Sequence, residues 1–317
     1  MDTEPTKEST VNTETPRITV VGSYNHGLTV SSPTIPVPGE TVLGSDFEEG
    51  VGGKGSNQAV AAARLGAEAT FVGRIGDDRF GEEAIALWER EGVDHTYVDR
   101  VPDVHTGVGF VIVDDDGENA IVVAPGANSR LDASAVETAV EAIRNADVVL
   151  CQLETEPEPV RVTMELAEAN GIASVLNPAP ARELPAELLG SVSYLTPNRT
   201  EARILAGYPP DADVDDHSIA AELLDRGVST VVLTQGADGA LVVTPDESVS
   251  ISAPDVDVVD TTGAGDAFNA GFAVALAEGH GPVKATRFGC RTGSLACTGY
   301  EVVPALPERE AVDALES

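Results

Sequence analysis

Two glycine-rich segments have the residue types and spacing of a site that holds an anion. One is DTTGAGD at residues 260–266, and the small apolar residues after it predict a buried helix over 267–277. The GAG tripeptide would then lie at the helix N-terminus, where free backbone N–H groups and the helix dipole favour an anion. A carboxylate at that place, Asp266, suggests phosphoryl transfer, because it can accept a hydroxyl proton while the amides hold developing charge. The same residues would also suit an ordinary helix cap.

The other segment, GVGGKGSNQAV, places a lysine inside a glycine loop. Lys54 lies between Gly53 and Gly55, and the chain contains only two other lysines. The alanine-rich pattern after the loop predicts a helix with Ser56 as its N-cap. Such a loop can grip a polyhydroxylated or anionic ligand with its backbone and its lysine. A solvated lysine in a flexible turn is the alternative interpretation.

Polar residues also follow several apolar runs that predict strands. They are Asn25, Glu154, Asn177, Asn198 and Thr234. Because parallel sheets bind ligands at the carboxyl ends of their strands, we expect these side chains to outline one cleft. Each of them alone would also suit a cap or an Asx turn.

The elements that must position these residues alternate regularly along the chain. Beyond about residue 132, buried strands alternate with helices, which are predicted near residues 133–145, 158–170, 200–206 and 217–226, and two more helices follow the GAGD helix. This alternation predicts an α/β fold in which helices cover both faces of a mainly parallel sheet. Short Thr- and Val-rich runs within residues 26–50 and 104–124 predict a small separate sheet.

The composition is strongly acidic. The 317 residues include 53 Asp and Glu against 19 Lys and Arg, and the net charge of −34 disfavours nucleic acids and anionic membranes as partners. Such a chain repels itself unless molar salt shortens the screening length to about 3 Å, which predicts the cytoplasm of a salt-accumulating halophile. Three cysteines without metal-ligand spacing suit a reducing cytosol. We find no signal peptide and no stretch long enough to cross a bilayer.

Together, the two glycine segments resemble the signatures of the ribokinase (PfkB-type) carbohydrate kinase family. GGKGSNQAV and DTTGAGDAFNAG stand in the family's order, and QLE, NPAPARELP, LTPNRTE and TQGADGA extend the resemblance from about residue 17 to the C-terminus. It implies a ribokinase-like three-layer α/β/α fold with a mainly parallel central sheet. One kinase domain would span residues 17–317, with a small β-sheet lid formed by residues 26–50 and 104–124. We expect a homodimer through this lid, and a disordered acidic tail at residues 1–16.

The resemblance also implies a role for each matching residue. Asp266 would be the catalytic base, and the anion hole for the transferred phosphoryl group would consist of Gly263, Ala264 and Gly265. The residues that would contact the sugar are Asn25, Gly53, Lys54, Asn57 and Glu154. The nucleotide site for ATP would comprise Asn198, Thr234, Gly236 and Gly265. Glu201 would organise Mg²⁺ through water, and the residues of a monovalent-cation site for K⁺ would include Asp260 and Thr262.

One position departs from the family pattern. Ribokinases carry an acidic residue two positions after the asparagine of the first strand turn, whereas GSYNHG has Gly27 there, preceded by His26. Losing that carboxylate weakens the grip on a neutral sugar by about 1.5–3 kcal/mol, and it removes repulsion against an anionic sugar. We therefore expect transfer of the γ-phosphoryl group to the 5-hydroxyl of ribose 1-phosphate, giving ribose 1,5-bisphosphate. Candidate contacts for the 1-phosphate are His26, Lys54 and Arg74.

Other functions stay open. Free ribose would give ribose 5-phosphate, and other PfkB-type substrates include nucleosides, fructose phosphates and ketodeoxy sugars. A dinucleotide-dependent oxidoreductase is disfavoured, because the first strand ends in GSYNHG and lacks G-x-G-x-x-G. A catalytically silent sugar sensor would have no need of the base in GAGD, and binding of ATP without turnover would identify one.

Overall fold

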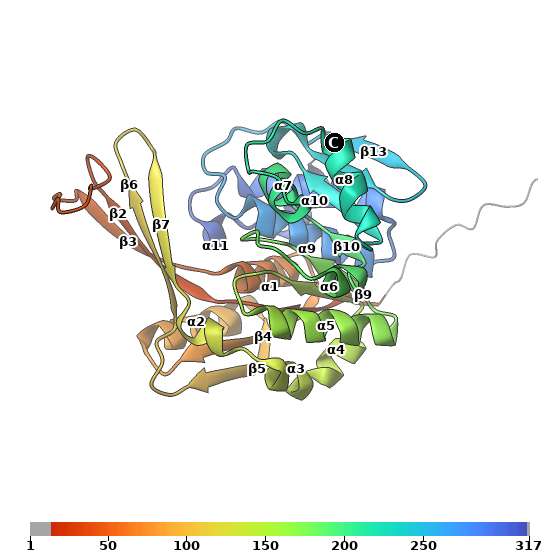
Figure 1. The fold of residues 1–317 in the computed structure, drawn as a ribbon. Helices are drawn as coiled ribbons and strands as arrows, with labels where there is room; N and C mark the ends of the chain where they lie inside the picture. Colours follow the sequence, from red (N-terminus) through yellow and green to blue (C-terminus); the bar gives the residue numbers. More distant parts are fainter. Residues whose placement is uncertain (1–13, 316–317) are drawn as a thin grey trace, which may run out of the picture.

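A nine-stranded sheet forms the centre of the molecule. A computed structural model describes residues 14–315 (Figure 1). The strands of this sheet are β1 (Arg17–Val21), β4 (Glu68–Gly76), β5 (Asp94–Val101), β8 (Val148–Cys151), β9 (Ala173–Leu176), β10 (Tyr194–Leu195), β11 (Thr230–Thr234), β12 (Ala240–Val243) and β13 (Ser248–Ile251). Their order is β13-β12-β11-β10-β9-β8-β1-β4-β5. β12 pairs antiparallel with both β11 and β13, and every other pairing is parallel, so the mainly parallel sheet is confirmed.

Helices cover both faces of this sheet. One face carries α1 (Lys54–Arg64), α2 (Arg79–Glu91), α9 (Ala264–Ala277), α10 (Pro282–Ala296), α11 (Val302–Ala305) and α12 (Arg309–Ala314). The other face carries α3 (Ala133–Thr138), α4 (Val140–Asn145), α5 (Pro157–Asn170), α6 (Ala186–Gly190), α7 (Arg199–Ala206) and α8 (Asp216–Asp225). Successive side chains of a strand point to opposite faces, so Val20 and Val21 of β1 are both buried, but in different cores. The predicted three-layer α/β/α fold is confirmed.

A second sheet, here called the small sheet, projects from this body (Figure 1). Its strands are β2 (Asn25–Ser31), β3 (Asp46–Gly52), β6 (Gly107–Val113) and β7 (Asn119–Ala124), in the order β3-β2-β6-β7. β2 pairs antiparallel with β3 and parallel with β6. Because β2 begins at Asn25, shortly after β1 ends, the root of the small sheet lies at the carboxyl end of a central strand.

The glycine loop before α1 corrects the predicted helix cap. Gly53, not Ser56, is the N-cap residue, and its φ of 89° favours glycine. A Cβ on Gly53 would lie 2.5 Å from the backbone N of Asn25, so the loop touches the root of the small sheet. The Ser56 hydroxyl instead accepts a hydrogen bond at 2.9 Å from Trp88 Nε1 of α2. The cap prediction was wrong because a serine hydroxyl can form a hydrogen bond to a neighbouring helix as readily as it can cap the end of its own helix.

Several other boundaries differ from the sequence-based prediction. The helix expected over 133–145 is two helices, interrupted at Ala139, and α10 is followed by α11 and α12 rather than by a single helix. β5 and α6 were missed. The polar residues of β5, at the edge of the sheet, obscure a strand pattern, and α6 spans a single turn or so. Two 3₁₀ helices, η1 (Gly126–Arg130) and η2 (Gly236–Asp238), complete the elements used below.

Residues 1–13 of the expected tail lie outside the described residues. Pro16, at its predicted end, is buried, and its carbonyl oxygen accepts a hydrogen bond at 2.8 Å from the N–H of Glu68 in β4. Within residues 14–315, none of the helices has the length and apolar character needed to cross a membrane.

Candidate active site

Helix α9 carries the GAGD motif at its N-terminus. Gly263 is the N-cap residue with φ 80°, and a Cβ there would lie 2.4 Å from Val302 Cγ1, so this position requires glycine. Ala264, Gly265 and Asp266 form the first turn, which starts before the predicted residue 267. A Cβ on Gly265 would meet no atom within 4 Å. The first-turn amides therefore have open space beside them for a ligand, next to the Asp266 carboxylate, which is 5% exposed.

Helix α1 packs beside α9 and holds that carboxylate. Asn57 Nδ2 donates to Asp266 Oδ2 at 2.9 Å, and Gln58 Nε2 donates to Oδ1 at 3.0 Å. Both donors are neutral and buried. Each carboxylate oxygen keeps a second lone pair, so Asp266 can still accept a proton from a bound hydroxyl.

A second carboxylate, Glu154, gathers three segments of the chain. Its Oε2 accepts hydrogen bonds from Ser23 Oγ at 2.5 Å, from Asn25 Nδ2 at 3.2 Å and from the backbone N–H of Lys54 at 3.0 Å. Asn25 is oriented in turn by Asn128 of η1, whose Nδ2 donates to Asn25 Oδ1 at 2.9 Å. The cluster joins the turn after β1, the root of β2, the N-terminus of α1 and the loop after β8.

Lys54 connects the two carboxylates electrostatically. Asp266 has the largest effect in raising the pKa of the Lys54 ammonium, and Glu154 and Glu201 add to it, while burial acts in the opposite direction. Lys54 therefore carries a positive charge between the Glu154 cluster and the first turn of α9, where an anionic group would be stabilised.

A cavity of about 460 Å³ opens at the N-terminus of α9. Its polar and backbone lining includes Asn198, Thr234, Gly236, Ala264 and Gly265. Its apolar lining includes Ala253, Pro254, Val256, Val258 and Phe268. All four residues expected in the nucleotide site thus border one cavity, whose apolar wall suits a flat base and whose helix N-terminus suits phosphates.

Asn198 and Glu201 form the capping box of α7. Asn198 Oδ1 accepts from the Glu201 N–H at 2.8 Å, and Glu201 Oε2 accepts from the Asn198 N–H at 2.9 Å. Burial raises the pKa of Glu201, which the backbone hydrogen bond and Lys54 partly offset. The two hydrogen bonds therefore hold Glu201 against Asn198, which lines the cavity.

Two of the three side chains expected to contact a sugar phosphate lie elsewhere. His26 is 1% exposed and stacks on Phe80 of α2 with ring centroids 4.0 Å apart, and burial lowers its pKa although Glu83 lies close by. Arg74 pairs with carboxylates of Asp99 and Asp132. In this structure the partners of both side chains therefore lie outside the Glu154 cluster. In β2, alternation puts His26 on the face opposite to Asn25.

Gly27 and the predicted cation residues have simpler environments. Gly27 shares a face of β2 with Asn25, and a Cβ there would meet only backbone atoms of Gly50, at 3.5 Å or more. Asp260 Oδ1 accepts from the backbone N–H of Thr262 at 2.9 Å and from its hydroxyl at 2.7 Å, which fixes the turn before α9.

Sequence reasoning missed several residues that support the site. Gln58, Gln152 and Asn128 were not singled out, although Gln58 directly follows Asn57 in the first glycine signature. Arg182 was quoted only within NPAPARELP, yet its guanidinium donates to the carbonyl oxygens of Leu153 and Thr155 on either side of Glu154.

The fold and this arrangement define a class of protein. The model of the pfkB family of carbohydrate kinases matches residues 15–309, and the chain belongs to that family. It is accordingly a phosphotransferase with an alcohol acceptor, and the oxidoreductase alternative is excluded.

Within the family, relatives named ribokinase are similar over almost the whole chain. Ribokinase of Haemophilus influenzae is 40% identical over 293 residues, covering 92% of this chain and 96% of the relative. Ribokinase of Bacillus subtilis is 39% identical over 300 residues, covering 95% and 99%. A deoxyribokinase of Salmonella typhi is 38% identical, covering 81% and 84%. A solved structure of Arabidopsis thaliana ribokinase complexed with ribose and ATP superimposes with a TM-score of 0.89 at 33% identity, covering 95% of this chain and 99% of that one.

Proposed function

We propose that the protein is an ATP-dependent ribokinase that phosphorylates the 5-hydroxyl of free ribose and releases ribose 5-phosphate and ADP. The observation that carries the proposal is the position of Asp266. It lies between the polar cluster around Glu154, which suits sugar hydroxyls, and the cavity at the N-terminus of α9, which suits a nucleotide. The ribokinase relatives and the ribose and ATP bound in the plant enzyme support the same substrates.

Ribose 1-phosphate is not retained as the substrate. Its case depended on basic contacts for the 1-phosphate, and His26 and Arg74 have partners away from the Glu154 cluster. Gly27 leaves open space beside Asn25, which a water molecule can fill while it bridges the sugar and the strand.

The chemistry assigned to each group follows from its place. Asp266 accepts the proton of the 5-hydroxyl while that oxygen forms a bond to the γ-phosphorus of ATP. The bond between the γ-phosphorus and its bridging oxygen breaks, and ADP leaves. Amides of the first turn of α9 stabilise the charge on the transferred group, and the Lys54 ammonium acts on the same charge from the side of α1.

Mg²⁺ would be held largely by the phosphates of ATP. Within residues 14–315, no group of three or more His, Cys, Asp or Glu side chains could hold a metal ion, whereas kinases often hold Mg²⁺ through one or two carboxylates, phosphates and water. Glu201 offers such a carboxylate, bonded to the backbone N–H of the cavity residue Asn198. The ion would neutralise phosphate charge. A K⁺ ion beside Asp260 and Thr262 stays a prediction.

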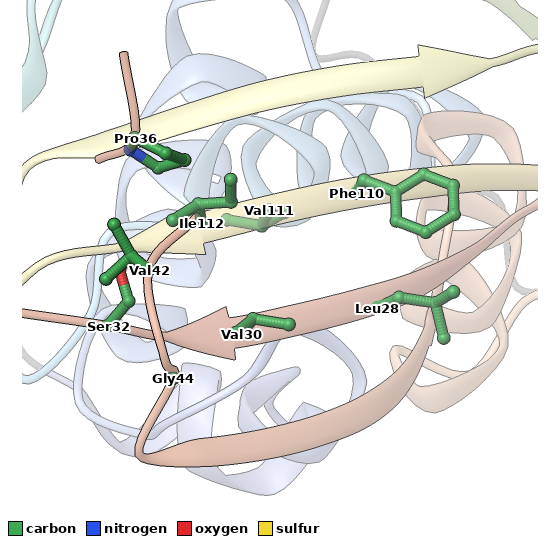
Figure 2. A pocket seen from close by; sticks show the side chains of 9 residues that line it. All are labelled: Leu28, Val30, Ser32, Pro36, Val42, Gly44, Phe110, Val111 and Ile112. Atoms are coloured by element: carbon green, nitrogen blue, oxygen red, sulfur yellow. The ribbon is translucent and has the colours of Figure 1, made fainter. Parts of the chain in front are cut away.

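We also propose that two copies of the chain associate through the small sheet. An apolar pocket of about 240 Å³ lies on this sheet, and Figure 2 shows Leu28, Val30, Phe110 and Ile112 along strands β2 and β6, with Pro36 and Val42 from the connecting segment beside them. The side chains of Phe47 and Val122 are more than half exposed, and that of Phe110 is half exposed. An exposed apolar surface of this kind is stabilised when the same surface of a second copy covers it and removes it from water. Sedimentation at micromolar concentration should give a dimer, which Phe110→Glu should dissociate.

A substrate panel tests the function. Ribose, deoxyribose, ribose 1-phosphate, a nucleoside, fructose 1-phosphate and ketodeoxygluconate are compared by ADP release with ATP, Mg²⁺ and molar KCl. Ribose should give the highest catalytic efficiency, by about tenfold or more over ribose 1-phosphate, since the 1-phosphate would be repelled by Glu154 and, of its three candidate contacts, would keep Lys54. A preference for any other sugar would reject free ribose as the substrate.

The matched control is Asp266→Asn, which keeps the shape of the side chain. It should bind ATP as the wild type does while losing about 10²- to 10⁴-fold in kcat. A kcat within a few-fold of the wild type would remove Asp266 from the mechanism. Binding of ATP by the wild type without any turnover would leave the sensor interpretation.

A further inference from the structure

A chain of buried amides runs beneath the proposed catalytic base. Gln58 of α1 donates through Nε2 to Asp266 Oδ1 at 3.0 Å, and its Oε1 accepts from Gln152 Nε2 in the segment after β8. Gln58 and Gln152 are 0% and 1% exposed. Gln152 therefore reaches Asp266 only through Gln58, and it lies too deep to contact a substrate.

The direction of this chain matters because an amide has a donor end and an acceptor end. If the Gln58 amide were reversed, its oxygen would face the Asp266 carboxylate. In the observed orientation Gln58 Nε2 donates to Asp266 Oδ1 and also to Asn177 Oδ1 at 3.3 Å, and the donation from Gln152 Nε2 to Gln58 Oε1 fixes the acceptor end of the amide. A reversed Gln152 would place oxygen against oxygen at Gln58.

The surroundings leave Gln152 little freedom. A Cβ on Gly22 would lie 2.0 Å from Gln152 Oε1, so the amide occupies the space that a side chain at position 22 would need. A second branch runs through Asn177, whose Oδ1 accepts from Gln58 Nε2 and whose Nδ2 donates to the Thr196 carbonyl oxygen, both at 3.3 Å. The Thr196 hydroxyl donates to Asn269 Oδ1, and Asn269 Nδ2 donates to the Gly265 carbonyl oxygen at 2.8 Å. Asp266 and the first turn of α9 are therefore both hydrogen-bonded to the same network of buried polar side chains.

We propose that Gln58 and Gln152 are positioning residues for phosphoryl transfer: Gln152 fixes the Gln58 amide, which holds the Asp266 carboxylate toward the acceptor hydroxyl. This inference rests on the proposed role of Asp266 as the base. Neutral donors suit that role, because they orient the carboxylate without the strong attraction of a directly bonded cation, which would make it a poorer proton acceptor. The charged groups that act on Asp266 are Lys54 and Glu201, and Glu154 acts on Lys54.

The test replaces Gln152 by two residues of similar size. In Gln152→Glu, the protonated acid can donate an O–H to Gln58 Oε1, but the ionised acid cannot. In Gln152→Met no donor exists at any pH. We measure kcat and both KM values from pH 5.5 to 9 for these variants and the wild type. Lys54, Glu154 and Glu201 stay unchanged, so their titration is common to all.

Three results are expected. Gln152→Met should lose about tenfold in kcat at every pH, with both KM values within about twofold of the wild type. Gln152→Glu should approach the wild-type kcat at low pH and fall toward the Met variant as pH rises. Thr163→Val, which removes the buried hydrogen bond from the Thr163 hydroxyl to the Pro159 carbonyl oxygen within α5, should leave kcat unchanged.

Other outcomes overturn the inference. A kcat for Gln152→Met within twofold of the wild type would do so, as would equal pH profiles for the Glu and Met variants. If both variants fail to fold, Gln58→Met takes their place, and an unchanged kcat with a lowered melting temperature would leave only a structural role. Should Asp266→Asn remain active, the assignment of the base itself fails, whatever the Gln152 variants show.

Discussion

At the scale of single residues, Arg182 holds the loop that carries Glu154. Its guanidinium donates to the carbonyl oxygens of Leu153 and Thr155, and the Leu153 N–H donates to the carbonyl oxygen of Ala179 at 3.0 Å. The NPAPAR segment therefore fixes the backbone on both sides of Glu154.

We predict that Arg182→Met acts on the sugar and not on the nucleotide. The variant keeps the length of the side chain but leaves two carbonyl oxygens without donors, so Glu154 can shift. Initial-rate kinetics should show KM for ribose raised about 5- to 30-fold, equal to roughly 1–2 kcal/mol, with KM for ATP unchanged. Arg144→Met, at an exposed ion pair with Glu141 on α4, should change neither constant. Equal changes in both KM values would contradict the prediction.

The sequence predicts some site residues better than others. Motif spacing singled out Lys54, Asn57 and Asp266, and the structure brings them together, because each signature is a short segment that folds as a loop and a helix. The orientation of His26 was not predicted, because neighbouring residues of a strand point to opposite faces, and only the structure shows that the face of His26 is the one packed on Phe80. Gln152 could not be found, since its partner Gln58 lies 94 residues earlier and the contact depends on how α1 packs.

At the scale of elements, α9 and α10 are in close contact through glycines. A Cβ on Gly271 would lie 2.4 Å from Thr292 Oγ1, and a Cβ on Gly289 would lie 2.9 Å from the Phe268 carbonyl oxygen. Near the first turn of α9, a Cβ on Gly293 would lie 3.1 Å from the Ala264 carbonyl oxygen. An apolar pattern predicts the helix α9 but gives no separation between helices, because that distance depends on which small residues face each other.

We predict that Gly271→Ala destabilises the protein. The new methyl group meets Thr292, which is buried and whose hydroxyl is bonded to the Phe288 carbonyl oxygen, so overpacking costs about 1–3 kcal/mol. The gain in helix propensity, about 1 kcal/mol, offsets only part of this. Urea unfolding should show the loss. Gly190→Ala, where a Cβ meets no atom within 4 Å, should be neutral or slightly stabilising. Equal stability of the two variants would contradict the overpacking argument.

At the scale of the whole molecule, the acidic surplus acts on every surface at once. A net charge of −34 on 317 residues produces repulsion that no single ion pair relieves. The fold class was predictable because alternation and burial are properties of long segments. The contribution of charge to stability was not predictable from the sequence, because it depends on the ions around the folded chain.

We predict that the melting temperature rises steeply with salt. Between low salt and molar KCl the screening length falls to about 3 Å, so repulsion between surface carboxylates is largely removed. Calorimetry at neutral pH should show the rise, and NaCl at the same ionic strength should give a similar one. Equal melting temperatures in dilute buffer and in molar KCl would count against a halophilic protein.

The bonds from α1 to Asp266 have a consequence for how the enzyme comes into being. They join residues 209 and 208 positions apart, so the ribosome makes Asn57 and Gln58 long before it makes their partner. Until α9 emerges, the nascent chain lacks both Asp266 and the first turn of α9, and part of α1 has no neighbour to pack against. An interrupted translation product would therefore have no phosphoryl-transfer activity. Only chains whose synthesis has passed α9 could transfer a phosphoryl group.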